Sequence, residues 1–260
     1  MVQPDRERNM TTRLFDIQTG FGGVKKGQTT PIALEDCLET MAKLGIAKAL
    51  VRIIPDAQEV DVCMANDRLF GACAKHPELV PCPIAVPATG RDLPDEDTQV
   101  VGFLDHNSGA AVIRPAQDYW QLTPWGSDDL FKAMAGRALP LVCPGGYVSL
   151  RDIGAIAGRF PDLPLIATEV GYRDHRTILP LLETFPNVHL SIGNNWTVHR
   201  GLEKTIEAIG PEQLLFGTGF PAAEPTMALT QLMYADISDE HRRLIAAGNM
   251  ERLQNARVIQ

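Results

Sequence analysis

Short apolar runs recur along the chain, and each is followed by a segment in which apolar residues return at helical spacing. The runs lack strict apolar–polar alternation, which is typical of parallel strands covered on both faces. The pattern predicts eight strands separated by helices, with two closing helices near 226–234 and 238–253. We expect the strands over 14–19, 48–55, 80–87, 110–114, 139–143, 163–169, 188–193 and 214–217.

Three local signals predict where helices begin. Thr30 followed by Pro31 places a hydroxyl cap before a proline in the first helical turn. Ser127, followed by two acidic residues, predicts a second start. Ser149 with Asp152 has the spacing of a capping box.

Eight strand–helix units favour a closed (β/α)8 TIM barrel, an α/β fold in one domain. A doubly wound open sheet is the alternative, but no G-x-G-x-x-G motif follows the first strand. We expect a loose polar arm over 1–12 and the barrel over 13–260, because no linker rich in Pro, Gly or Ser divides the chain.

Composition and charge argue against several classes of function. The formal net charge of -8 and the lack of a basic stripe argue against nucleic-acid binding. No apolar run has the length of a membrane span, and the first residues do not read as a signal peptide. The five cysteines show no C-x-x-C spacing, which favours reduced thiols in a cytoplasmic protein.

The active site of such a barrel lies at the carboxyl ends of its strands. Candidate groups are therefore the polar, reactive or glycine positions where each predicted strand stops. They are Asp16, Gln18, Gly20, Arg52, Arg114, Gln117, Cys143, Pro144, Glu169, Asn194, Asn195, Trp196, Thr218 and Gly219.

Several segments in the right order resemble one known family. Residues 160–171 read FPDLPLIATEVG and residues 214–221 read LLFGTGFP. Residues 160–171, 185–190 and 214–221 resemble strands six, seven and eight of the amidohydrolase-related (amidohydrolase 2 type) branch of the metal-dependent hydrolases. Residues 237–253 resemble the closing helix of that family. That resemblance implies a TIM barrel and a hydrolase or decarboxylase activity.

The metal positions of that family are substituted here. Its usual H-x-H pair would fall on Gln18 and Gly20, its fifth-strand histidine on Pro144, its sixth-strand histidine on Glu169, and its eighth-strand aspartate on Gly219. Only Glu169 among these can bind a cation, whereas a zinc site needs about three or four converging ligands. We therefore expect no metal and no other cofactor.

Glu169 and Arg114 are the predicted catalytic residues. Glu169, with a nearby histidine, would act as general acid or base. Arg114 would clamp a substrate carboxylate, or else pair with an acid at a strand end. The predicted ligand-binding residues are Gln18, Tyr147, His175, Asn194, Asn195, Trp196 and His199; Tyr119, Trp120 and Trp125 could add to an aromatic wall, and plain loop packing is the alternative.

Three hypotheses follow. The first is a barrel that hydrolyses or decarboxylates a small organic acid or ring compound without the usual metal. The second is a catalytically inactive binding or scaffold member of the family. The third is a hydrolase with a displaced metal site at Glu169, His175 and His199. In each, the partner is a small-molecule ligand, and a homo-oligomer is compatible with this type of barrel.

Overall fold

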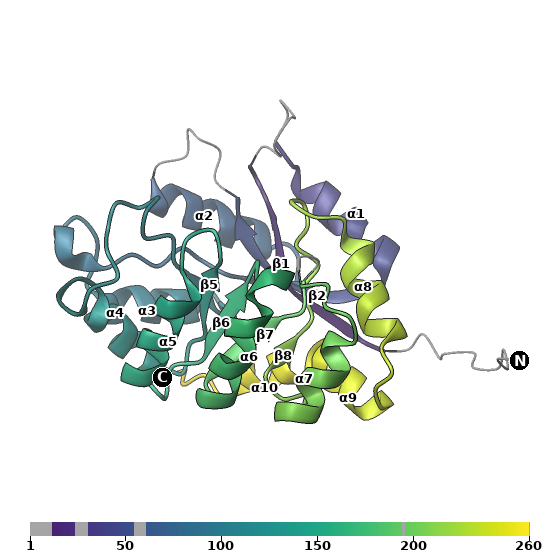
Figure 1. Cartoon of the computed structure of the whole chain (residues 1–260). Helices are drawn as coiled ribbons and strands as arrows, with labels where there is room; N and C mark the ends of the chain where they lie inside the picture. The colour runs from purple at the N-terminus through teal and green to yellow at the C-terminus, as the bar shows by residue number, and fades with distance from the viewer. Residues whose placement is uncertain (1–11, 24–30, 55–60, 194–195, 260) are drawn as a thin grey trace, which may run out of the picture.

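The computed structural model describes residues 12–23, 31–54, 61–193 and 196–259. Strands lie at its centre and helices surround them (Figure 1). The strands are β1 (Leu14–Phe21), β2 (Ile46–Ile53), β3 (Leu79–Pro81), β4 (Ala111–Val112), β5 (Leu141–Pro144), β6 (Leu165–Thr168), β7 (Val188–Ser191) and β8 (Leu214–Leu215). The α-helices are α1 (Leu34–Leu44), α2 (Val62–Cys73), α3 (Glu96–Asp105), α4 (Pro124–Gly136), α5 (Leu150–Arg159), α6 (His175–Thr184), α7 (Gly201–Ile209), α8 (Pro225–Tyr234), α9 (Asp239–Arg243) and α10 (Asn249–Asn255).

The strands close into a ring, which confirms the predicted (β/α)8 barrel. β1 to β3 and β4 to β8 form two parallel sheets, and Ile84 bridges to Val112 between β3 and β4. On the other side, the Ile17 N–H donates to the Phe216 carbonyl at 2.9 Å. The Gly219 N–H donates to the Gln18 carbonyl at 2.8 Å. These two bonds join β1 to the end of β8.

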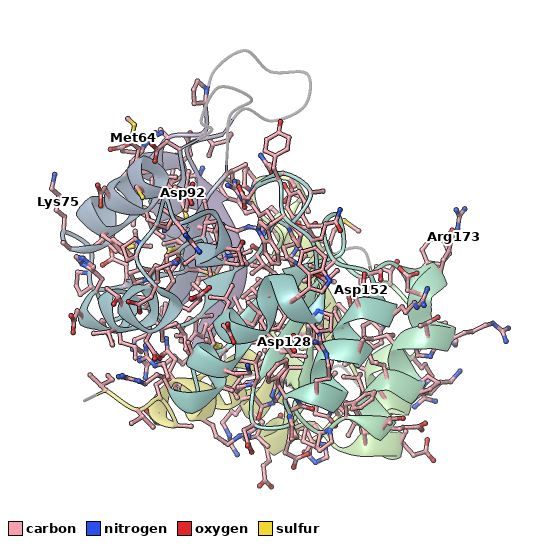
Figure 2. The ribbon with its side chains drawn as sticks, turned by 90° about the vertical axis from the view of Figure 1, so that its left-hand side faces the viewer. Met64, Lys75, Asp92, Asp128, Asp152 and Arg173 are labelled. Atoms are coloured by element: carbon pink, nitrogen blue, oxygen red, sulfur yellow. The ribbon has the colours of Figure 1, made fainter. Side chains whose placement is uncertain are left out.

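The apolar runs became strands because both of their faces are covered. Every residue of β1, β5, β6 and β7 is buried. The helices bury one stripe each; α5, for example, buries Ile153, Ile156 and Ala157, which are spaced three and one residues apart. On the outer face of α2, Met64 points away from the body of the molecule in Figure 2, as do Lys75 and Arg173, which lie outside the α-helices.

The three helix starts had different outcomes. Ser149 caps α5 as predicted, since its side chain accepts from the Asp152 N–H at 3.1 Å. The Ser127 prediction is wrong: α4 begins earlier, at Pro124, and the Ser127 hydroxyl donates to the Thr123 carbonyl inside the first turns. Proline at the first position starts that helix four residues sooner than a cap at Ser127 would, since the observed cap is Thr123.

The other predicted boundaries shifted modestly. Helix α1 begins at Leu34, three residues beyond Pro31, while Thr30 lies outside the described residues. The closing helix is divided into α9, a π-helical turn over Leu244–Gly248, and α10. Of the arm expected over 1–12, only residue 12 is described. Within the described ranges, no helix combines the length and apolarity needed to cross a membrane.

Candidate functional site

A cavity of about 490 Å³ opens where the strands end at their carboxyl side. Its volume lies in the range of small-molecule sites. Residues from the ends of six strands contribute to its wall, together with the loop after β8. They are Gln18, Arg52, Ile53, Ile54, Val112, Arg114, Gly145, Gly146, Tyr147, Glu169, Gly219, Phe220, Pro221, Ala222 and Ala223.

An ion pair crosses this cavity wall between β2 and the end of β6. The Arg52 Nη2 lies 2.7 Å from the Glu169 Oε1. The side chains are 22% and 30% exposed, so both have remaining access to solvent or ligand. The two residues are 117 positions apart in sequence, and barrel closure brings them together.

The Glu169 backbone adopts a left-handed conformation, with φ of 62°. For a residue with a Cβ this costs roughly 1–2 kcal/mol. Two glycines make room beside it: a Cβ on Gly145 would lie 3.1 Å from the Glu169 carbonyl oxygen, and one on Gly146 would lie 3.4 Å from its Oε2. The strained turn places the carboxylate on the cavity wall, and such strain is often stored at functional sites.

Arg114 also lines the cavity, but it is 4% exposed and firmly held. Its Nε and Nη2 donate to the two Asp118 carboxylate oxygens at 3.1 and 2.6 Å. The remaining Nη1 is buried and has no hydrogen-bond partner among the described residues. Arg114 therefore pairs with an acid, as one alternative predicted, while its role as a clamp for a substrate carboxylate stays a prediction.

Gln18, in the second half of β1, presents its amide in a fixed orientation. The Ser191 hydroxyl donates to Gln18 Oε1 at 2.9 Å. A Cβ on Gly193 would lie 2.9 Å from that same oxygen, so the glycine leaves space for the contact. With its oxygen occupied, Gln18 retains its NH₂ group as a donor at the cavity wall.

Next to the cavity, a fully buried carboxylate fastens β1 to the strand-eight loop. Asp16 Oδ1 accepts the N–H groups of Gln18 and Thr218, each at 2.9 Å, and Oδ2 accepts the Thr218 hydroxyl. Burial raises the pKa of Asp16, although these three donors act in the opposite direction. Asp16 is a structural acceptor and does not line the cavity.

The other predicted ligand-binding residues lie in different parts of the structure. Tyr147 lines the cavity. Trp196 is only 1% exposed and packs beside His175, with their ring centroids 5.8 Å apart. His199 lines a separate, open hollow beside Met227. Asn194 and Asn195 lie outside the described residues.

Neither the aromatic wall nor the displaced metal site is formed. Tyr119 and Trp125 are 89% and 81% exposed, so they do not enclose a ligand. Across the described ranges, no three His, Cys, Asp or Glu side chains are placed to hold a metal ion. The prediction of a metal site from Glu169, His175 and His199 is therefore wrong.

The sequence predicted that Arg52 lies at the site but did not indicate its role. Its position at the end of a strand identified it as a candidate, yet nothing in the sequence indicated that Glu169 would be its partner. Asp118, the partner of Arg114, was not among the candidates because it lies four residues beyond the strand-end arginine.

Comparison with known proteins identifies the family. The sequence model described as Amidohydrolase matches residues 15–253. No curated protein sequence matches the chain. The structural comparisons with known folds support the same barrel.

One similar structure is the 5-carboxyvanillate decarboxylase of Novosphingobium aromaticivorans, complexed with manganese and 4-hydroxy-3-methoxy-5-nitrobenzoic acid (13% identity, TM-score 0.75, 94% of this chain and 96% of that one). Another is the dihydroxybenzoic acid decarboxylase of a Polaromonas species, with bound manganese and the inhibitor 2-nitroresorcinol (15% identity, TM-score 0.71, 94% and 97%). A third is an uncharacterized TIM-barrel protein of Bordetella bronchiseptica (18% identity, TM-score 0.66, 86% and 83%). At these identities the likeness concerns the fold.

Proposed function

The chain belongs to the amidohydrolase family, and from this premise we propose that its cavity binds a small organic acid or ring compound and decarboxylates or hydrolyses it without a catalytic metal. The observation that carries the proposal is Glu169. Its carboxylate lies on the wall of a ligand-sized cavity, in a strained backbone conformation, and its hydrogen bond to Arg52 uses the Oε1 atom. The aromatic acids named for the two decarboxylases support this ligand class.

The residues present do not fit the manganese found with those two decarboxylases. Glu169 is the one carboxylate of the cavity wall in the described residues, and it is already paired with Arg52. Gln18 offers a single amide oxygen, which accepts from Ser191. Hard divalent cations need several oxygen ligands that converge on one point. The proposed reaction therefore uses the chain's own residues.

The chain's own groups would supply binding and proton transfer. Arg52 and Arg114 would hold the acid group of the ligand, and the apolar side of the cavity, including Ile54 and Phe220, would hold its body. In hydrolysis, Glu169 would take a proton from the attacking water. In decarboxylation, it would carry the proton that replaces carbon dioxide on the ring carbon. General acid–base catalysis of this kind contributes about 10²–10⁴-fold to a rate.

The second candidate is a binding protein without catalysis. The substitutions at the family's metal positions favour it, because Gln18, Gly20, Pro144 and Gly219 cannot assemble the usual metal site. Such a protein would use the same cavity and the same arginines, but it would release its ligand unchanged.

A turnover screen separates the two candidates. Lactones, aryl carboxylates and cyclic amides would be incubated with the wild type and with Glu169→Gln, and products followed by chromatography. We expect Glu169→Gln to lower kcat at least about 100-fold on the accepted substrate. Glu183→Gln, at an exposed position of α6, is the matched control and should retain the wild-type rate.

Equal rates in the wild type and Glu169→Gln would remove Glu169 from the mechanism. If no compound turns over but some raise the melting temperature of the protein, the binding function replaces the catalytic one.

A further inference from the structure

A second cavity, which we call the rear cavity, lies between the ends of β5 and β6 and the first turns of α5 and α6. Its volume is about 290 Å³, and it shares only Gly145 and Glu169 with the candidate-site cavity. The other residues that line it are Cys143, Val148, Ser149, Leu150, Ile153, Thr168, Val170, Asp174 and Thr177. We propose that the rear cavity is a separate binding site for a small alkylammonium ion.

The hydroxyl group of Thr168 indicates that a ligand belongs in the rear cavity. Thr168 is 0% exposed, and its Oγ1 has no hydrogen-bond partner in the described part of the chain. It lines the rear cavity and does not line the candidate-site cavity. A buried polar group without a partner costs free energy, which a ligand that hydrogen-bonds to Oγ1 would recover.

The lining of the rear cavity is rich in oxygen and carries no cationic side chain. Glu169 and Asp174 are its two acidic residues, and Ser149 and Thr177 add hydroxyl groups to that of Thr168. This charge favours a cation over an anion. An ammonium group has three N–H donors and no acceptor, so it can use the Thr168 hydroxyl as well as a carboxylate.

Two helices begin at the rear cavity, and their dipoles alone would favour an anion. Acidic residues offset both dipoles. Asp152 lies in the first turn of α5, next to its cap Ser149, and Asp174 is the N-cap residue of α6. Arg52 pairs with Glu169, but it lines only the candidate-site cavity. The groups nearest to the rear cavity are therefore negative on balance.

The rest of the lining favours an alkylammonium ion over a metal ion. Val148, Leu150, Ile153 and Val170 are apolar and would contact an alkyl chain. Burial raises the pKa of the Cys143 thiol, so this residue offers no thiolate to a soft metal. Within the described ranges, no three His, Cys, Asp or Glu side chains are placed to hold a metal ion.

The test compares n-butylammonium chloride with 1-butanol, which has a similar shape without the charge, by isothermal titration calorimetry at constant ionic strength. We expect the wild type to bind butylammonium at least about tenfold more tightly than butanol. Thr168→Val keeps the shape of the side chain and removes the hydroxyl, and it should weaken butylammonium binding at least about fivefold. Asp174→Asn keeps an oxygen for the Gly171 N–H and should weaken it about two- to fivefold.

Thr184→Val is the matched control, because Thr184 lies at the other end of α6, does not line the rear cavity and should bind butylammonium as the wild type does. Equal affinity of the wild type for butylammonium and butanol would overturn the inference even if Thr168→Val failed to fold. Unchanged butylammonium affinity in both Thr168→Val and Asp174→Asn would also overturn it, by moving the ion to the candidate-site cavity. Binding of KCl as tight as that of butylammonium would overturn the choice of an amine.

Discussion

The seam between β1 and β8 and the cavity wall between β2 and β6 use similar side chains in opposite ways. At the seam, Asp16 is 1% exposed and takes three donors, so both of its oxygens are used to close the barrel. On the cavity wall, Glu169 and Arg52 share one contact and remain partly exposed. Among the described residues, both Asp16 oxygens at the seam are occupied, whereas the Arg114 Nη1 at the cavity wall has no hydrogen-bond partner.

Within one ring of strands, the seam residues therefore serve stability, and the residues of the cavity wall are available for binding. A buried carboxylate with every partner in place mainly fixes the fold, and breaking it leaves orphaned donors. A strained, half-exposed carboxylate with unused acceptor capacity contributes little to folding and can serve a ligand. Variants of the two kinds should therefore affect different measurements.

The largest effect is expected at the seam. Asp16→Ala would leave the Gln18 N–H and the Thr218 N–H and hydroxyl buried without acceptors. At about 1–3 kcal/mol for each, we expect a loss of at least about 3 kcal/mol in the free energy of unfolding, measured by urea denaturation. Asp129→Ala, which breaks only an exposed pair with Lys132, should change it by less than about 0.5 kcal/mol. Equal losses in both variants would contradict the assignment of Asp16 as the fastening of the barrel.

A comparable effect is expected from a buried histidine of the barrel wall, and it should depend on pH. Burial lowers the pKa of His189 from 6.5 to about 4. The unfolded chain therefore takes up this proton first, and stability is retained above pH 6.5 and lost as pH falls from 6.5 towards 4. The loss attributable to His189 should approach about 3 kcal/mol.

Unfolding of the wild type and of His189→Gln at pH 7, 6, 5 and 4 would measure this loss as the pH-dependent part of the difference between them. His241→Gln, on α9, provides the control for the loss of an imidazole outside the barrel wall. A difference between wild type and His189→Gln that stays constant over this range would show that His189 is not held neutral by the fold.

The smallest effect concerns the strained backbone of the cavity wall. Glu169→Gly and Glu169→Gln both remove the ion pair with Arg52, but only glycine also relieves the left-handed conformation. We expect Glu169→Gly to be more stable than Glu169→Gln by about 1 kcal/mol, measured as the difference in unfolding free energy. If the glutamine variant is the more stable, the turn after β6 stores no strain.

The sequence predicted the barrel well because the relevant signals are local. An apolar run covered on both faces, or a stripe such as that of α5, depends on residues a few positions apart. Ser149 capped its helix for the same reason. Ser127 misled because an acidic pair resembles a first helical turn, whereas Pro124 fixes the true start.

The sequence predicted which residues lie at the site, but it did not predict which of them pair with each other. The strand-end rule located Gln18, Arg114 and Glu169 on the cavity wall correctly. It could not show that Arg52 pairs with a residue 117 positions away, since that contact is a product of ring closure. Nor could it show that His199 faces another hollow, because the loop that follows β7 decides this.

The contact between Asp16 and Thr218 also affects the order of events during protein synthesis. The two residues are 202 positions apart, so during synthesis the first strand waits for nearly the whole chain before its outer edge is covered. At about 5–20 residues per second, that interval is roughly 10–40 s on the ribosome. For that period β1 exposes an unpaired edge, the kind of surface that invites aggregation. The join that closes the finished barrel is thus the last to form on β1 during synthesis.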